Sequence, residues 1–356
     1  MKKHNFSSGP AMLPKVVFEK AAAATINLDN SGLSILEISH RSSAFQEILG
    51  KTEALIRQML DIPESYAVLF LTGGASSQFY MAPMNLLPKE QKAGFIDTGR
   101  WSDKAIKEAK QFGEISVIAS SEDRDYTYIP KSYSIESNLT YLHVTSNNTI
   151  YGTQYKQLPQ TTVPLVCDMS SDIFSYPVDI HRFGLIYAGA QKNLGPAGVT
   201  LVIVKKEMLE QTQRLIPTML DYRTHIAKGS AFNTPPVFPI FVSMLTLEWL
   251  EGKGGIKAMQ EKNEAKAKLF YDELDRNGLL KGVVATEDRS VMNATFVTVN
   301  KDLENAFLEL CTQADISGIK GHRTVGGFRA SMYNAMEMES VQLLIEVMQY
   351  FEKKYG

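Results

Sequence analysis

The stretch Tyr187-Ala-Gly-Ala-Gln-Lys-Asn-Leu-Gly-Pro-Ala-Gly198 joins two short apolar runs, residues 185–188 and 199–204. Apolar runs of this length between turn residues predict buried β-strands, with a tight connection between them. A single lysine, Lys192, lies on that connection at the edge of the predicted sheet. Because desolvation lowers the pKa of an amine toward that of a usable nucleophile, the stretch favours a Schiff-base lysine. A solvated loop lysine is the alternative when Lys192 is considered alone.

Strand-like and helix-like patterns alternate on both sides of this stretch. Further apolar runs occupy residues 66–71, 93–96, 115–118, 140–144 and 164–167, which makes about seven strands in all. Helical patterns at residues 42–60 and 101–112 separate several of them. This alternation is typical of an α/β fold in which helices cover both faces of a mostly parallel seven-stranded sheet.

The pattern changes at Gly254. A long helix to about residue 277 is followed by strands near residue 283 and at 294–299, and by helices from residues 301 and 337. A chain of 356 residues that is 44% hydrophobic can bury two cores. We therefore predict a large α/β domain at residues 15–253, and a smaller α+β domain formed by residues 1–14 together with 254–356.

Composition excludes several classes of function. A net charge of -2 and a pI near 6.3 provide no basic field for nucleic acid or acidic membranes, so small molecules are the expected partners. The two cysteines, Cys167 and Cys311, form no CxxC pair, so neither a disulfide framework nor a metal site is indicated. The sequence shows no apolar run of membrane-spanning length and no secretory leader, and it predicts a cytoplasmic protein with no membrane partner.

Candidate site residues follow the predicted strands, where parallel α/β sheets bind their ligands. Thr72-Gly-Gly-Ala-Ser-Ser-Gln78 leads from a strand into a helix, whose backbone N–H groups suit a phosphate, although Gly-Gly turns also end many strands. Asp168 follows the run at 164–167 and is suited either to holding a protonated ring nitrogen or to capping a turn. Trp101 suits either stacking on a planar cofactor or core packing.

Three histidines each precede an arginine. The pairs are His40-Arg41, His181-Arg182 and His322-Arg323, and Arg329 follows the last pair. Guanidinium groups match carboxylates and phosphates, and an adjacent imidazole adds a donor. The second pair precedes the amino end of a strand, so we assign it a structural role. The other two pairs are candidate anion sites, with solvated surface charge as the alternative.

Longer stretches carry a family resemblance. They are Asn5-Phe-Ser-Ser-Gly-Pro-Ala-Met-Leu-Pro14, Glu37-Ile-Ser-His-Arg41, Gly189-Ala-Gln-Lys-Asn-Leu-Gly-Pro-Ala-Gly198 and Gly321-His-Arg-Thr-Val-Gly-Gly-Phe-Arg-Ala-Ser-Met-Tyr-Asn-Ala335. The match covers nearly the whole chain, which resembles the phosphoserine aminotransferases, a family of class V pyridoxal-phosphate enzymes. The resemblance implies the type I aminotransferase fold, pyridoxal 5'-phosphate as cofactor and a homodimer with shared active sites.

The resemblance also implies a reaction. L-glutamate and 3-phosphooxypyruvate would be converted reversibly to 2-oxoglutarate and O-phospho-L-serine, a step of serine biosynthesis. A related activity on 4-phosphohydroxythreonine, in pyridoxine biosynthesis, is known in the family. Lys192 would form the Schiff base and move the proton, while Asp168 would pair with the ring nitrogen. Trp101 would stack on the ring and Thr149 would bind its 3-hydroxyl.

The remaining residues implied by the resemblance bind anions. The cofactor phosphate would be held by Ala75, Ser76 and Gln191, and by Asn233 and Thr234 of the neighbouring subunit. The carboxylates and phosphate of the substrate would be bound by His40, Arg41, His322, Arg323 and Arg329. One departure concerns Ser76, because some family members carry an arginine in this loop; the backbone role at this position survives the change.

Two other functions are alternatives to this interpretation. A cysteine desulfurase or lyase of the same fold group needs a cysteine on a mobile loop, whereas Cys167 and Cys311 lie in predicted strand or helix segments. A nicotinamide-binding protein needs a GxGxxG turn after its first strand, and this chain has none there. One observation distinguishes these functions: a protein that is yellow and loses its colour when glutamate is added is an aminotransferase.

Overall fold

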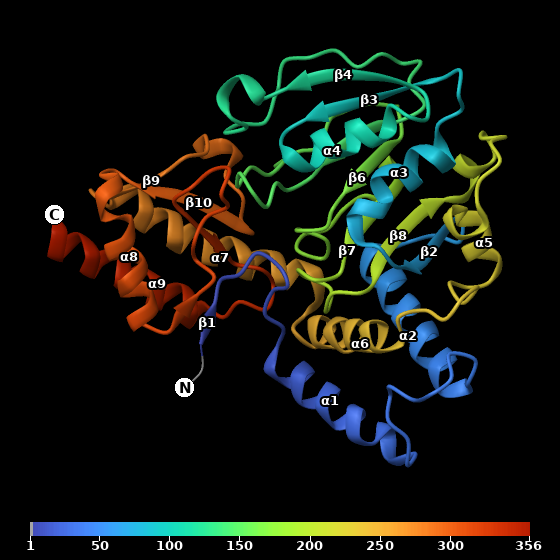
Figure 1. Cartoon of the computed structure of the whole chain (residues 1–356), viewed down its shortest axis with the longest axis horizontal. Helices are drawn as coiled ribbons and strands as arrows, with labels where there is room; N and C mark the ends of the chain where they lie inside the picture. The colour runs from blue at the N-terminus through green and yellow to red at the C-terminus, as the bar shows by residue number, and fades with distance from the viewer. Residues whose placement is uncertain (1–2) are drawn as a thin grey trace.

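The computed structural model describes residues 3–356, and its largest element is a seven-stranded sheet (Figure 1). The strands in spatial order are β2 (Tyr66–Leu71), β8 (Thr200–Lys205), β7 (Phe183–Gly189), β6 (Leu165–Asp168), β5 (Leu142–Thr145), β3 (Lys92–Asp97) and β4 (Glu114–Ser120). Only β8 runs antiparallel to its two neighbours, and every other pair is parallel. The prediction of a mostly parallel sheet is therefore confirmed.

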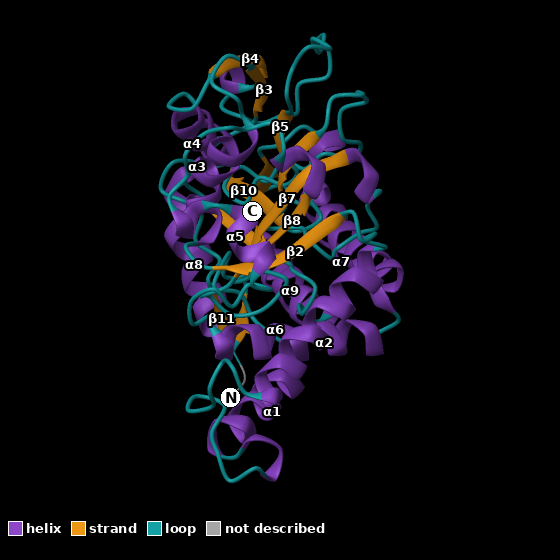
Figure 2. Cartoon of the chain, turned by 90° about the vertical axis from the view of Figure 1, so that its right-hand side faces the viewer, coloured by secondary structure: helices purple, strands orange, loops and turns teal. Residues whose placement is uncertain are grey.

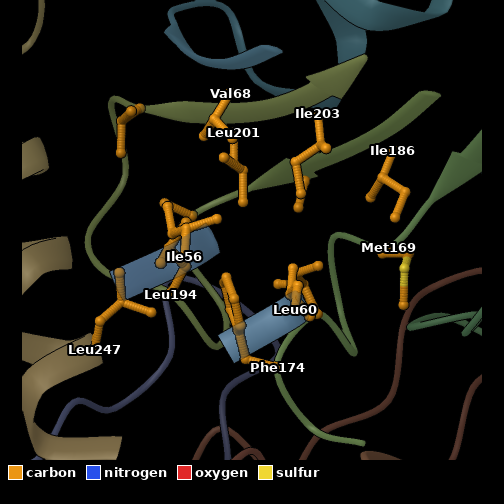
Figure 3. Close-up of a cluster of buried hydrophobic side chains, with 14 of the residues drawn as sticks. Ile56, Leu60, Val68, Met169, Phe174, Ile186, Leu194, Leu201, Ile203 and Leu247 are labelled. Carbon is orange, nitrogen blue, oxygen red and sulfur yellow. The ribbon is translucent and has the colours of Figure 1, made fainter. Parts of the chain in front are cut away.

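Helices cover both faces of this sheet (Figure 2). One face packs against α1 (Lys15–Ile26), α2 (Ser43–Leu60) and α6 (Val237–Gly252), and the other against α3 (Gly74–Leu86), α4 (Arg100–Ala109) and α5 (Tyr222–Ala227). Strand residues alternate between the two cores because successive side chains point to opposite faces. Val68 and Ile203 meet Ile56 and Leu60 of α2 in the first core (Figure 3). All six residues of β2 are buried although it is an edge strand, because helices cover both faces of the sheet there.

A second sheet lies in the C-terminal part of the chain. Its strands, in the order β12 (Phe328–Ser331), β10 (Asn293–Thr298) and β9 (Leu280–Gly282), are antiparallel. They pack with α7 (Gly255–Arg276), α8 (Glu304–Gln313) and α9 (Met338–Tyr355) around an aromatic core that includes Phe270, Phe296 and Phe307. Short 3₁₀ turns occur at Leu28–Asn30, Glu122–Arg124, Ile180–Arg182, Lys206–Leu209, Thr218–Leu220, Thr286–Asp288 and Lys301–Leu303.

The N-terminal segment joins this C-terminal part. β1 (His4–Asn5) pairs in parallel with β11 (Ile316–Ser317), and Phe6 is buried in the same aromatic core. This pairing supports the division into residues 15–253 and residues 1–14 with 254–356, which we retain as a proposal. Within residues 3–356, no helix combines the length and apolarity needed to cross a membrane.

Candidate active site

A cavity of about 250 Å³ lies at the carboxyl ends of β2, β3, β5, β6 and β7. Its lining residues are Gly73, Gly74, Ala75, Ser76, Trp101, Thr145, Asn147, Thr149, Asp168, Ser170, Ser171, Gln191 and Lys192. Larger hollows of about 700 and 600 Å³ lie elsewhere on the surface, and neither is lined by a predicted site residue. The cavity therefore brings together seven of the residues predicted from the sequence: Ala75, Ser76, Trp101, Thr149, Asp168, Gln191 and Lys192.

Lys192 enters the cavity from the turn after β7. The turn is tight, because the Lys192 backbone N–H donates to Ala190 O over 2.7 Å, and a Cβ at Gly195 would overlap Ser243 of α6. Lys192 Nζ donates to Thr149 Oγ1 over 2.6 Å. Burial lowers the pKa of Lys192 to about 8; the Asp168 carboxylate opposes this shift, and Arg329 adds to it. A large fraction of this amine is therefore unprotonated, and so nucleophilic, at slightly alkaline pH.

Asp168 is the last residue of β6 and is buried. Its Oδ1 accepts a hydrogen bond from the Ser170 backbone N–H over 2.9 Å, which orients the carboxyl group at the cavity wall. Burial raises the pKa of Asp168, while the hydrogen bonds from Ser170 and the charge of Lys192 lower it. A buried carboxylate facing a cavity favours a cationic group on the ligand.

The first turn of α3 forms another wall of the cavity. Gly73 and Gly74 lead into it with φ of 93° and 65°, and no side chain caps the helix. The first backbone N–H groups of a helix lack intrahelical acceptors and carry partial positive charge, so Ala75 and Ser76 present donors for an anion. Gln191 also lines the cavity and adds an amide group.

Three buried polar atoms near this cavity have no hydrogen-bond partner in the part of the chain that the structure describes. They are Trp101 Nε1, Thr145 Oγ1 and Arg329 Nε. Buried polar groups are normally paired, so unpaired ones at a cavity indicate donors kept for a ligand. An amine, a carboxylate, an indole and a helix N-terminus around one cavity fit a flat cofactor that carries a phosphate group.

Arg329 links this cavity to the C-terminal part of the chain. The residue lies on β12 and is buried, with Nη1 donating to Thr149 O over 3.0 Å and Nη2 to Ser8 Oγ over 2.6 Å. His322 and Arg323 lie on the preceding turn, half-buried and exposed respectively. Burial lowers the pKa of His322, and the charges of Arg329, Arg100 and Arg323 lower it further. These cationic groups therefore gather on one side of the site.

The other seven predicted residues do not line this cavity: His322, Arg323 and Arg329 lie on the C-terminal side described above, and four more lie elsewhere on the chain. His40 and Arg41 lie on the turn before α2, where His40 O accepts a hydrogen bond from Gln46 Nε2 over 2.8 Å and Arg41 is exposed. Asn233 and Thr234 are exposed in the segment before α6. Arg182, which we assigned a structural role from the sequence, donates to Pro159 O over 2.6 Å at the amino end of β7. This contact agrees with that role.

Other residues at the site were not singled out from the sequence. Thr145 ends β5 and Asn147 follows it, while Ser170 and Ser171 follow Asp168 at the end of β6. Their position at the carboxyl end of a strand could have identified them. Ser8 meets Arg329 across 321 positions of the chain, and no local pattern indicates such a contact.

The family model described as aminotransferase class-V matches residues 3–344. The chain belongs to the class V aminotransferase family. It is 56% identical to the phosphoserine aminotransferase of Flavobacterium psychrophilum over 355 residues, which cover 99% of this chain and 100% of the relative. These matches confirm the resemblance noted in the sequence.

Solved structures show the same fold. The phosphoserine aminotransferase from Bacillus circulans subsp. alkalophilus has a TM-score of 0.97 at 44% identity, with 100% of this chain and 99% of that chain covered. The PLP-bound phosphoserine aminotransferase from Trichomonas vaginalis has a TM-score of 0.93 at 35% identity, with 98% and 100% covered. The class V aminotransferase fold predicted from the sequence is therefore confirmed.

Proposed function

We propose that this chain is a pyridoxal-phosphate-dependent phosphoserine aminotransferase. It would transfer the amino group between L-glutamate and 3-phosphooxypyruvate, giving O-phospho-L-serine and 2-oxoglutarate for serine biosynthesis. The observation that carries the proposal is the Lys192 amine, which lies in a cavity with Asp168 and donates to Thr149 over 2.6 Å. The names and identities of the relatives described above supply the substrate class.

The residues around the cavity fit the cofactor. Pyridoxal phosphate, when bound, supplies an electron sink that stabilises negative charge at the substrate α-carbon. Asp168 would hold the protonated ring nitrogen, since its carboxylate is the buried acid of the cavity wall. Trp101 would cover the ring and Thr149 would bind the ring hydroxyl. Ala75, Ser76 and Gln191 would hold the phosphate.

Lys192 has two tasks in this proposal. Its unprotonated amine would hold the cofactor through its carbonyl carbon, and Nζ would serve as a general base once an amino donor is bound. As that base, Lys192 Nζ would accept the proton of the substrate α-carbon and would carry it until it is returned in the second half of the transfer. A pKa of about 8 suits both tasks, because the amine can accept and release a proton near neutral pH.

Different cationic groups would bind different anionic groups of the substrate. Arg329 would bind the α-carboxylate, because it is buried next to Thr149 and hence close to Lys192. His322 and Arg323 would bind the distal anion, the phosphate of O-phosphoserine or the side-chain carboxylate of glutamate. Charge-assisted hydrogen bonds of this kind are worth on the order of 1.5 to 3 kcal/mol each.

A homodimer with shared active sites completes this assignment. His40, Arg41, Asn233 and Thr234 lie outside the cavity of their own chain, so they would reach the cofactor and substrate of a second copy. Exposed apolar side chains precede His40 and Arg41 in the sequence, and they support a surface that the second copy would cover. They include Val16, Phe18, Ile26, Leu33 and Leu36. We place the dimer in the cytoplasm, where two buried unpaired cysteines are expected.

A cysteine desulfurase or lyase is not favoured. Cys167 lies in β6 and Cys311 in α8, both are buried, and burial raises the pKa of each thiol, that of Cys311 to about 12. A reactive cysteine needs the opposite shift and an accessible position.

The test is a half-reaction with purified protein. Glutamate and O-phosphoserine should each remove the yellow colour of the cofactor-loaded protein, whereas serine should do so far more slowly. Lys192→Ala should bind cofactor without a borohydride-reducible link and lose the reaction. Lys257→Ala, at an exposed position of α7, is the matched control and should behave as the parent does. Bleaching by neither amino donor, or full turnover by Lys192→Ala, would contradict the proposal.

A further inference from the structure

The small antiparallel sheet has a buried polar face. Along β10 and β12, apolar and polar side chains alternate, and successive side chains of a strand point to opposite faces. The apolar ones, which lie in the aromatic core, are Ala294, Phe296, Phe328 and Ala330. The polar ones, which are buried on the opposite face, are Asn293, Thr295, Arg329 and Ser331. Because buried polar groups normally have hydrogen-bond partners, this face must contact other polar groups.

The polar face packs against the loop that follows β5. Thr295 Oγ1 donates to Tyr151 O over 2.6 Å. A Cβ on Gly152 would lie 2.7 Å from Thr295 Oγ1, so the loop and the strand approach each other closely. The same loop carries Thr149, whose hydroxyl accepts from Lys192 Nζ over 2.6 Å. The small sheet is therefore fixed to the segment that contacts the reacting amine.

Hydrogen bonds join this loop, the small sheet and the N-terminal segment in a closed ring. Asn147 Nδ2, in the loop, donates to Asn293 Oδ1 of β10 over 2.8 Å. Asn293 Nδ2 donates to Tyr333 Oη over 3.1 Å. Tyr333 Oη in turn donates to Ser8 O over 2.8 Å. The first half of the ring therefore runs from the loop, through the small sheet, to the N-terminal segment.

Arg329 closes the ring. Its Nη2 donates to Ser8 Oγ over 2.6 Å, and its Nη1 donates to Thr149 O over 3.0 Å. Thr149 lies two positions after Asn147, so the path returns to the loop where it began. Both terminal nitrogens of the guanidinium are held by the protein, whereas Nε has no hydrogen-bond partner among residues 3–356. The ring therefore sets the direction in which Arg329 presents its free donor.

We propose that Tyr333 is a positioning residue for recognition of the substrate α-carboxylate. Its hydroxyl fixes Ser8, and Ser8 fixes the guanidinium of Arg329. This inference rests on the proposed function, in which Arg329 binds the α-carboxylate close to Lys192. A guanidinium that is already held in its bound orientation loses less side-chain freedom when the substrate arrives, so it binds the carboxylate more tightly.

Amines with and without an α-carboxylate test the proposal. O-phosphoserine and glutamate carry this group, whereas O-phosphoethanolamine and 4-aminobutyrate keep the amine and the distal anion but lack it. Tyr333→Phe should raise KM for O-phosphoserine and glutamate by roughly 10- to 100-fold, with a much smaller change in kcat. The inhibition constants of O-phosphoethanolamine and 4-aminobutyrate should change by less than about twofold.

Tyr66→Phe is the matched control. Tyr66 is buried like Tyr333, and its hydroxyl donates to Ile180 O over 3.0 Å and to Phe183 O over 2.8 Å. These carbonyls lie at the amino end of β7, at the opposite edge of the sheet from the cavity. Both variants should lower the free energy of unfolding, because each leaves a buried carbonyl oxygen without its donor. Only Tyr333→Phe should change KM, and an equal rise in KM for Tyr66→Phe would show that the effect is merely one of stability.

Ser8→Ala removes the other link to Arg329 and keeps the proposal testable if Tyr333→Phe does not fold. It should raise the same two KM values. The double variant should lose less than the product of the single losses, because both changes act on Arg329.

Three results would be decisive against the proposal or its basis. Equal changes for amines with and without the α-carboxylate, or fully multiplicative losses in the double variant, would overturn the role of Tyr333. A parent enzyme that does not act on O-phosphoserine would instead overturn the proposed function, and glutamate compared with 4-aminobutyrate would still test Tyr333.

Discussion

At the scale of single residues, Asp172 is a buried acid outside the cavity whose pKa is shifted by its surroundings. It lies four positions after Asp168 and is fully buried. Its Oδ1 lies 2.5 Å from Ser146 Oγ, and its Oδ2 accepts from Gln154 over 3.3 Å and from Tyr176 over 3.2 Å. Burial raises the pKa of Asp172 to about 6, against the effect of these hydrogen bonds, and the charge of Asp168 adds to the rise.

This shift predicts a pH-dependent stability. A carboxyl group whose pKa is raised from 3.8 to about 6 by folding binds more protons in the native state, so its stabilising contribution is present below pH 4 and is lost as the pH rises through 6. Asp172→Asn removes that dependence. Relative to the parent, the variant should gain up to about 3 kcal/mol of unfolding free energy between pH 4 and pH 7.

Urea unfolding across this pH range measures the effect. Asp123→Asn, at an exposed position, is the control and should differ from the parent by a constant amount. A parent-to-variant difference that is flat between pH 4 and pH 7 for Asp172→Asn would show that folding does not shift this carboxyl group.

At the scale of elements, the start of α3 depends on glycine for its shape. Gly73 has φ of 93°, and a Cβ there would overlap Ser77 Oγ one turn later in the helix. The residues that present N–H groups to the cavity, Ala75 and Ser76, follow immediately. A change at position 73 therefore alters the direction of the proposed phosphate donors as well as the local backbone.

We expect Gly73→Ala to destabilise the protein by about 1 to 3 kcal/mol, because both the positive φ and the overlap are unfavourable. It should also weaken binding of pyridoxal phosphate, measured by equilibrium titration of cofactor-free protein. Gly50→Ala is the matched control: Gly50 is exposed within α2 and has nothing near its Cβ position, so alanine should stabilise by about 0.5 to 1 kcal/mol. Thermal unfolding that ranks the two variants in the opposite order would contradict this account.

At the scale of the whole molecule, the proposed sites need two chains. Lys192 lines the cavity, whereas Thr234 is exposed outside it. Lys192→Ala and Thr234→Ala homodimers should each have low activity. When the two are mixed and allowed to exchange subunits, each hybrid dimer should hold one site with both residues intact, and about a quarter of the parent activity should return.

The control for this mixture uses two residues of one cavity. Lys192→Ala mixed with Asp168→Asn leaves every site with one defect, so no activity should return. If Lys192→Ala mixed with Thr234→Ala behaves in the same way after subunit exchange is confirmed by mass spectrometry, each site is built from a single chain.

Local sequence alone determined the seven strands of the large sheet and much of the cavity. Residues 66–71 were predicted as a strand and form β2, because an apolar run between turn residues has few other ways to bury its side chains. Ala75, Trp101, Asp168 and Lys192 each follow a predicted strand, and parallel strands bring their carboxyl ends to one edge of the sheet. The family resemblance then supplied the chemistry of that edge.

Only the tertiary structure decided which distant segments meet. The pairing of β1 with β11 and the contact of Ser8 with Arg329 each join segments more than 300 residues apart. The reversed direction of β8 is likewise set by its pairing with β2 and β7. A local pattern indicates which side chains will be buried, but not which surface of the protein will cover them. That choice depends on packing and charge summed over the whole chain, which is why the contacts of Arg329 with Thr149 and Ser8 became visible only in the folded protein.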